Sequence, residues 1–322
     1  MSNNYSSYKL GLFLSFSSAF LWSTTFIAAK NLMKEQQIDP FSLSLIRFAL
    51  GGIILFILGA VFLKDKIFAI TVKDLLQLTF LSLTGIVGMS LFLFMGQKST
   101  SAINTSIIMA TAPVLTLFIG TFIGEKLLGN KIAGMIICLL GCALAINVIT
   151  ANGIQYHSDS LNGDLLVLLS AICWAIYSVF SVPIVKRLGG FAATTWAMLL
   201  GSVVLLIIEL FLPQQSQLPD TAHGWSLVIY IAVFPTALAF FAWYEAMNKI
   251  ELSLLNVMQY LSPIFTIILA MLLLGETINI LNIGGIILVI IGIAITVVTP
   301  QRATAGWCRF KLRTCVILKV GK

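Results

Sequence analysis

The sequence of 322 residues has little charge. Only 10% of its residues are Asp, Glu, Lys or Arg, whereas ordinary soluble domains carry about 25%. Hydrophobic residues make up 59% of the chain, and the mean hydropathy is +1.03. So few polar side chains cannot cover a water-soluble body. The composition therefore excludes an ordinary soluble domain and predicts a membrane protein.

The sequence also lacks the motifs of an enzyme or a metalloprotein. Its two histidines, His157 and His223, both lie between apolar runs, and neither an HExxH nor a GxxxxGKS/T pattern occurs. The five cysteines have no metal-ligand spacing. No acidic residue lies near the middle of an apolar run, so an intramembrane protease dyad and an obvious proton carrier are both missing. We expect no enzyme activity, no metal and no cofactor, and the coupling ion stays open.

Long apolar runs recur along the whole chain. A helix needs about 20 mostly apolar residues to cross a bilayer, and ten segments meet this description. They are 10–30, 41–63, 74–96, 102–123, 130–149, 163–186, 191–212, 225–247, 252–274 and 279–298. We therefore expect an all-α membrane protein with ten transmembrane helices joined by short connections.

Positive charge is distributed unevenly over the two sides of this arrangement. If the spans alternate in direction, fifteen of the nineteen Lys and Arg residues fall on the side of both termini and four on the other. Because positive residues concentrate in cytoplasmic loops, we expect a multi-pass protein of the inner (plasma) membrane with both termini in the cytoplasm. The net charge of +7 then orients the chain in the lipid bilayer, and we expect no nucleic-acid partner.

Several phrases of the sequence occur twice. PVLTLFIGTFIGE at 113–125 corresponds to PIFTIILAMLLLGE at 263–276, and SAFLW at 18–22 corresponds to SAICW at 170–174. Proline, tryptophan and the Gly-Glu pair are rare in this chain, so their agreement in order indicates an internal repeat rather than chance.

Each copy of the repeat contains five spans. Because five is an odd number, the second copy enters the membrane from the opposite side, which makes the two copies inverted repeats. We predict one five-helix repeat at 1–150, a second, inverted one at 151–299, and a basic cytoplasmic tail at 300–322. Secondary transporters commonly have this architecture, since two such halves can present one midplane site to each side in turn.

Pro113 and Pro263 begin the two long repeated phrases. A proline inside a helix removes a backbone hydrogen bond and weakens the preceding turn, so we expect a helix kink at each position. In lipid the freed carbonyl groups need polar neighbours or a wet cavity. The kinks therefore mark a substrate path or are packing features, and the sequence alone leaves both interpretations open.

Glycines repeat as well, at Gly134 and Gly141 in the fifth span and at Gly285 and Gly292 in the tenth. Small residues allow helices to approach closely in lipid. We interpret these two spans as a scaffold or as a dimer face, away from the substrate site. The expected oligomeric state is a monomer or a homodimer.

Four features carry a family resemblance: SAFLWSTTFIAAK at 18–30, LIRFALGG at 45–52, the two phrases from proline to Gly-Glu, and AFFAWYEAM at 239–247. With these the chain, from about 8 to 299, resembles the EamA-type branch of the drug/metabolite transporter superfamily. The resemblance implies a ten-helix inner-membrane carrier with a central cavity, often an exporter of amino acids, their derivatives or other small metabolites. Import, or transport of cationic or aromatic drug-like compounds, is the alternative.

Arg47 is the most informative candidate for binding a small-molecule substrate. An arginine inside a span costs roughly 2.5 to 3.5 kcal/mol on insertion scales, so it usually faces protein or water. Its planar, two-pronged head suits a substrate carboxylate. Arg47 lies only a few residues inside its span, however, and the sequence equally allows it to reach the outer membrane interface.

Aromatic and amide side chains complete the candidate substrate-binding set. Trp22 and Trp174 correspond in the repeat and lie deep in their spans, where both stacking on a substrate and ordinary packing are open. The remaining candidates are Tyr177, Trp243, Tyr244, Asn256, Gln259 and Tyr260. Neutral polar residues of lower priority are Thr24, Thr25, Gln97, Asn104, Ser106 and Ser178.

Overall fold

A computed structural model describes most of the chain. The described residues are 2–35, 38–121, 129–145, 149–150, 153–154, 158–211, 217–247, 249–250, 258 and 261–297. The helices up to residue 145 are α1 (Ser2–Lys34), α2 (Pro40–Phe62), α3 (Asp65–Phe68), α4 (Val72–Ser82), the π-helix η1 (Leu83–Gly88), α5 (Met89–Ser99), α6 (Ala102–Met109), α7 (Ala112–Gly120) and α8 (Gly129–Ala145). Two short strands, β1 (Ile149–Thr150) and β2 (Gly153–Ile154), then pair antiparallel, with Ile149 opposite Ile154.

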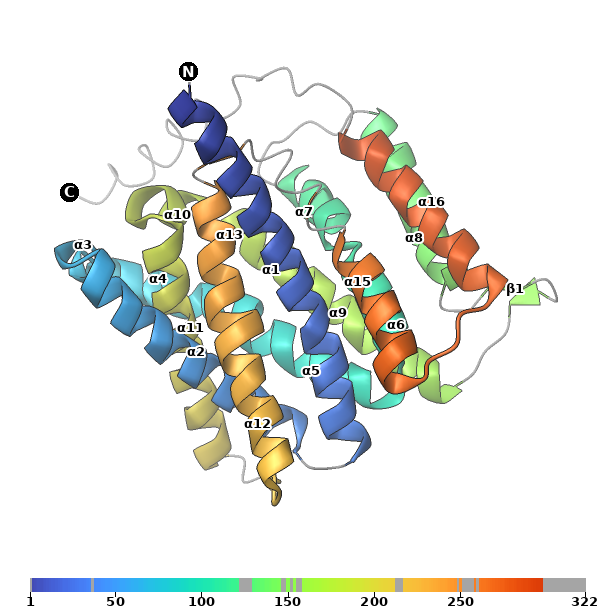
Figure 1. The fold of residues 1–322 in the computed structure, drawn as a ribbon, viewed down its shortest axis with the longest axis horizontal. Helices are drawn as coiled ribbons and strands as arrows, with labels where there is room; N and C mark the ends of the chain where they lie inside the picture. The colour runs from blue at the N-terminus through green and yellow to red at the C-terminus, as the bar shows by residue number, and fades with distance from the viewer. Residues whose placement is uncertain are drawn as a thin grey trace, which may run out of the picture.

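The rest of the described chain is again helical. It contains α9 (Ser158–Phe180), α10 (Val182–Leu188), α11 (Gly190–Phe211), α12 (Ala222–Ile231), the π-helix η3 (Ala232–Leu238), α13 (Ala239–Met247), α15 (Leu261–Leu269), the π-helix η4 (Ala270–Leu274) and α16 (Ile280–Val297). Figure 1 shows these helices as one bundle in which α8 and α16 lie together at one side.

Within the described part of the chain, seven helical segments are long and apolar enough to cross a membrane. They are Ser7–Met33, Pro40–Phe62, Val72–Ser99, Ala102–Gly120, Leu161–Phe180, Gly190–Phe211 and Ala222–Ala246, and two shorter apolar helices, Leu261–Leu274 and Ile280–Gly292, follow. The expected helical membrane fold is therefore confirmed. Each of the ten segments marked from the sequence contains described helix, but the number of ten spans stays a prediction.

Local signals explain where several of these helices begin. The side chain of Asp39 accepts hydrogen bonds from the backbone N–H groups of Phe41 and Ser42, and Pro40 occupies the first turn of α2, where its missing N–H costs nothing. Thr71 and Asp74 form a capping box at the start of α4, each side chain accepting from the other residue's backbone N–H.

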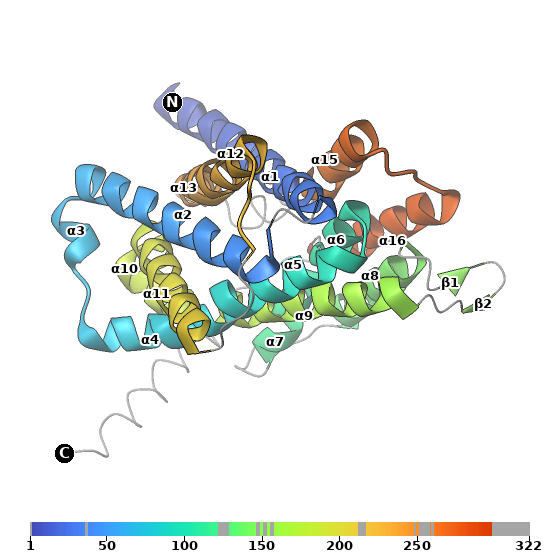
Figure 2. The same ribbon diagram turned by 90° about the horizontal axis from the view of Figure 1, so that it is seen from below.

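The contacts between the two halves of the chain occur in pairs. In each pair, the second contact is the first one with the roles of the two halves exchanged. Helix α1 packs along α13, and α5 packs along α9, side by side in Figure 2. Ser18 of α1 donates a hydrogen bond to the carbonyl oxygen of Ala239 at 2.9 Å, and Ser170 of α9 donates to that of Met89 at 2.6 Å. The donor Ser170 follows the donor Ser18, and the acceptor Ala239 follows the acceptor Met89, each by about 150 residues. An internal two-fold relation between the halves requires such a pair of bonds.

Helices α8 and α16 make an equally reciprocal contact. A Cβ atom on Gly141 would stand 2.8 Å from the carbonyl oxygen of Gly285, and one on Gly292 would stand 2.6 Å from that of Gly134. Only glycine permits this approach, so the repeated glycines join the two halves of one chain. This contact agrees with the scaffold interpretation, while the oligomeric state stays a prediction.

Polar contacts bring connections from the two halves together at the ends of the bundle. Arg187, which follows α9, pairs with the buried carboxylate of Asp74 at the start of α4. The backbone N–H of Gln217 donates to the Asp39 side chain at 2.9 Å, and the N–H of Asp39 donates to the Gln217 carbonyl oxygen at 3.2 Å. In the alternating arrangement the first pair lies at the end expected to face the cytoplasm and the second at the other.

Candidate functional site

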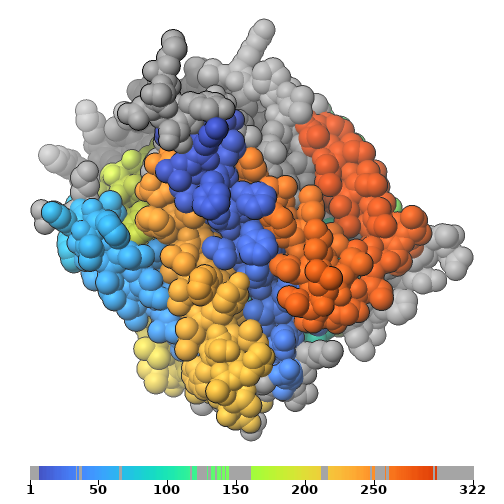
Figure 3. All heavy atoms as spheres, in the orientation of Figure 1, coloured from blue at the N-terminus to red at the C-terminus, as the bar shows by residue number. Residues whose placement is uncertain are grey.

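A cavity of about 100 Å³ lies where helices of both halves meet. A space of about 10 to 15 Å³ suffices for one water molecule, so the cavity has room for several waters or a small ligand. Helices α1 and α13, which contribute to its wall, lie beside each other on the face seen in Figure 3, where α15 flanks α1 on its other side. The lining residues are Trp22, Thr25, Phe26, Arg47, Met89, Leu93, Ser106, Met109, Ala110, Ala112, Pro113, Trp174, Phe240, Ser262 and Pro263.

Corresponding residues of the two halves line this cavity together. Trp22 and Trp174, which the repeat pairs, both line it, and so do Pro113 and Pro263. Met89 and Phe240, which follow the π-helices η1 and η3, are separated by the same shift of about 150 residues. The cavity thus lies where an internal two-fold axis would pass.

Pro113 divides its span into two helices. Helix α6 ends at Met109 and α7 begins at Ala112, and the hydroxyl of Thr111 between them donates to the carbonyl oxygen of Ile108 at 2.6 Å. Met109, Ala110 and Ala112 at this break all line the cavity. Pro263 lies in the first turn of α15, and residues 259 and 260 before it are outside the described part of the chain.

Arg47 is held from the opposite half. Its Nε donates to the hydroxyl of Thr236 at 2.7 Å, and this hydroxyl donates to the carbonyl oxygen of Ile231 at 2.8 Å. Pro235, inside η3, has no N–H for that carbonyl, its partner in a regular helix. In the π-helix the backbone N–H of residue 236 is the partner of that carbonyl, and the Thr236 hydroxyl donates to it as well. The lone pairs of the hydroxyl remain free to accept from Arg47.

The guanidinium of Arg47 lies inside the protein and not at the membrane interface. The residue is 4% exposed, and its Cζ lies 4.9 Å from the ring centre of Phe48 and 5.6 Å from that of Phe94. Aromatic faces of this kind stabilise a cation. Its Nη1 is buried and has no hydrogen-bond partner among the residues that the structure describes. An unpaired buried charge is costly, so this side of the cavity favours an anion.

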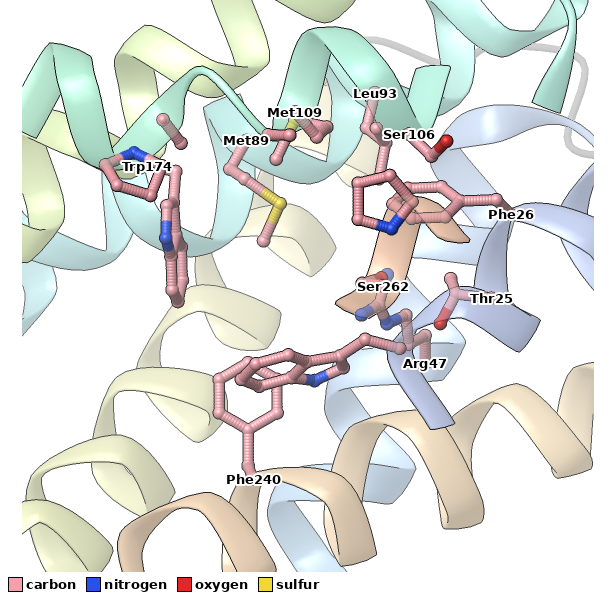
Figure 4. Close-up of a pocket in the computed structure, with 15 residues that line it drawn as sticks. Thr25, Phe26, Arg47, Met89, Leu93, Ser106, Met109, Trp174, Phe240 and Ser262 are labelled. Atoms are coloured by element: carbon pink, nitrogen blue, oxygen red, sulfur yellow. The ribbon is translucent and has the colours of Figure 1, made fainter. Parts of the chain in front are cut away.

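The polar side chains of the cavity lie together on one side, which they share with the apolar Phe26 and Leu93. Figure 4 shows Arg47, Thr25 and Ser262 gathered on one side, with Trp174 and Phe240 on the other. The arrangement suits a small molecule that has a polar or anionic end and an apolar body.

Three aromatic candidates do not line the cavity. Trp243 packs at 4.9 Å, ring centre to ring centre, from Trp22. Tyr177 is buried, and its ring centre lies 5.6 Å from that of Trp174. Tyr244 packs so closely on Gly190 that a Cβ there would stand 2.2 Å from its ring. These residues support the lining tryptophans or the helix packing and do not face the cavity.

The remaining candidates, Asn256, Gln259 and Tyr260, lie outside the described residues, so their part in a site stays a prediction.

Sequence reasoning missed several residues of the site. Met89, Phe240 and Ser262 line the cavity, and Thr236 supports Arg47. Phe240 stands inside the family-like stretch AFFAWYEAM, and Thr236 follows a proline within a span, which was the available signal for it. Met89 gives no such signal, because apolar residues are the rule in every span.

The comparison with protein families decides what kind of protein holds this cavity. The model of the EamA-like transporter family matches residues 9–147 and again 161–298. The chain belongs to the EamA-like transporter family. The two matches fall on the two halves that share the cavity, so this EamA-like chain has the two-repeat composition of its family and is a multi-pass membrane protein.

Relatives of this EamA-like chain are named as transporters. It is 27% identical over 300 residues to the uncharacterized transporter YetK of Bacillus subtilis (strain 168), covering 92% of this chain and 90% of the relative. It is 25% identical over 213 residues to a probable terminal-alkyne amino-acid exporter of Streptantibioticus cattleyicolor, covering 63% and 67%. A solved crystal structure superposes with a TM-score of 0.64 at 19% identity, covering 91% of this chain and 98% of the other, which shows the common fold.

Proposed function

We propose that this EamA-like protein is a secondary transporter that moves small metabolites by alternating access and exports amino acids or their derivatives. In this proposal ten transmembrane helices form two inverted halves, 1–150 and 151–299, in the inner (plasma) membrane with both termini in the cytoplasm. The cavity between the halves is the substrate site.

One observation carries the proposal: corresponding residues of both halves line a single cavity. Two inverted halves that exchange conformations present a site on their common axis first to one side of the membrane and then to the other. The presence of Trp22 with Trp174 and of Pro113 with Pro263 in the lining supports this interpretation.

The chemistry of the lining supports amino acids or their derivatives as substrates. Arg47 supplies a cation for a carboxylate, and Trp22, Trp174 and Phe240 supply an apolar wall for a side chain. The similarity to a probable terminal-alkyne amino-acid exporter agrees with this class. The aromatic wall also suits aromatic drug-like compounds, which are the second candidate.

Counterflow in proteoliposomes tests the proposal. Metabolites that raise the melting temperature of the purified protein are first selected, and labelled substrate is then offered to vesicles loaded with unlabelled substrate. A carrier accumulates label by exchange, whereas a channel does not. We expect exchange that Arg47→Ala abolishes and Trp174→Ala weakens. Transport without exchange would contradict alternating access, and uptake by inside-out vesicles distinguishes export from import.

A further inference from the structure

Two residues that line the cavity each carry a buried hydrogen-bond donor without a partner among the described residues. The first is Nη1 of Arg47. The second is the hydroxyl of Thr25, which is 3% exposed and has no hydrogen-bond partner among the described residues. Both residues line the same cavity, and Figure 4 shows them close to each other on its polar side.

Thr25 differs in this from its neighbours on α1. Ser23 donates to the carbonyl oxygen of Phe20 at 2.6 Å, and Thr24 donates to that of Leu21 at 2.7 Å. A buried hydroxyl in a helix ordinarily bonds to the preceding turn in this way. Leaving such a group unpaired costs stability, so the free hydroxyl of Thr25 points to a ligand.

The charge around these donors is of one sign. Arg47 is the only ionisable residue among the described lining residues, and none of them is acidic. A carboxylate in the cavity gains a charge-assisted hydrogen bond from Arg47. A substrate ammonium would lose its water there without meeting an opposite charge, and it would be repelled by Arg47.

We propose, building on the function proposed above, that the cavity selects carboxylates that carry no free ammonium group. Arg47 and Thr25 bind the two carboxylate oxygens, and the apolar wall receives the rest of the molecule. The substrate class is a small monoanion with an apolar or aromatic body, such as an N-acylated amino acid or an arylalkanoic acid. Thr25 is therefore a specificity-determining residue for this site.

Binding of four matched probes to the purified full-length protein tests the charge selection. The probes share a phenyl body: N-acetylphenylalanine is an anion, N-acetylphenylalaninamide is neutral, phenylalanine is a zwitterion and phenethylamine is a cation. We expect N-acetylphenylalanine to bind at least tenfold more tightly than each of the other three, as measured by tryptophan fluorescence. Equal or tighter binding of phenylalanine or phenethylamine overturns the inference.

Substitutions at Thr25 test the role of its hydroxyl. Thr25→Val keeps the shape of the side chain and removes the hydroxyl, whereas Thr25→Ser keeps the hydroxyl. We expect Thr25→Val to lower the affinity for N-acetylphenylalanine about tenfold without changing that for the amide, and Thr25→Ser to retain most of the preference. A Thr25→Val protein that keeps the full preference for the anion overturns the role of Thr25.

The failure of this inference can be distinguished from failure of the proposed function. Exchange of a zwitterion or a cation in the counterflow experiment leaves alternating access intact and overturns the charge selection alone. If none of the four probes binds, the charge selection is also overturned. The counterflow experiment still tests the transporter function independently. Migration of each variant as wild type in size-exclusion chromatography shows that it is folded.

Discussion

Arg47 shows how a single residue of an apolar chain acquires a role. A cation inside a span needs an acceptor and a favourable surrounding, and here Thr236 supplies the first and Phe48 and Phe94 the second. The guanidinium is thus held through Nε and the aromatic rings, while Nη1 has no hydrogen-bond partner among the described residues. The same contacts therefore stabilise the charge of Arg47 and leave part of its guanidinium for a ligand.

Thr236→Val is the residue-scale test of this support. Valine retains the shape of threonine but leaves Arg47 Nε without its hydrogen-bond acceptor, and an unsatisfied buried group costs about 1 to 3 kcal/mol. We expect a lower melting temperature and weaker substrate binding, while Thr236→Ser, which keeps the hydroxyl, stays close to wild type. Unchanged melting and binding in Thr236→Val would contradict a supporting role.

At the scale of elements, the contact between α8 and α16 depends on glycine. Gly141→Ala would place a Cβ 2.8 Å from the Gly285 carbonyl oxygen, so the helices must separate. Overpacking of this kind costs about 1 to 3 kcal/mol, and we expect a clear drop in thermal stability. Gly284→Ala is the matched control, because its Cβ would make an ordinary contact of 3.5 Å with Leu144. Equal stability of the two variants would count against the close approach.

Glu276 joins the ends of two other elements. Its carboxylate oxygens accept from the backbone N–H groups of Ala102 at 2.8 Å and Ile103 at 3.1 Å, so a residue after η4 caps helix α6 of the other half. Gly275, with φ of +65°, allows the turn that brings the carboxylate there. The contact closes one end of the bundle across the two halves.

Glu276→Ala is therefore expected to loosen that end. Loss of a helix cap costs about 0.5 to 2 kcal/mol, and a membrane-impermeant maleimide should label Ser106→Cys in the cavity faster, from the outer side, when Glu276 is replaced. Thr71→Ala removes a cap from α4 within one half and serves as the control, with lower stability and unchanged labelling. Equal labelling in both backgrounds would show that Glu276 acts as a helix cap alone.

At the scale of the whole molecule, the proposed orientation predicts which connections face the cell exterior. In a variant whose five cysteines are replaced by alanine, Asp220→Cys is expected to react with an impermeant maleimide in intact cells. Lys73→Cys should react only after the membrane is permeabilised, because positive residues stay in the cytoplasm. The reverse pattern would invert the orientation, and labelling of both positions from outside would contradict alternating spans.

The sequence by itself determined that lipid surrounds the protein, where its helices lie and which residues of the two halves correspond. Hydrophobic content and the long apolar runs are properties of composition, and the rare residues Trp22, Trp174, Pro113 and Pro263 reveal the repeat wherever they lie in space. Their correspondence is a matter of order along the chain, but the sequence left open whether these four residues mark a site or are packing features.

The tertiary structure alone decided which side chains face the cavity. Helices that are apolar all round have no polar stripe to show which face turns inward, so Tyr177 and Tyr244 were candidates alongside Trp22 and yet do not line the cavity. Arg47 could face lipid headgroups or protein, and only its contact with Thr236 of the other half settles the choice. Such contacts join residues almost two hundred positions apart, and no local pattern encodes them.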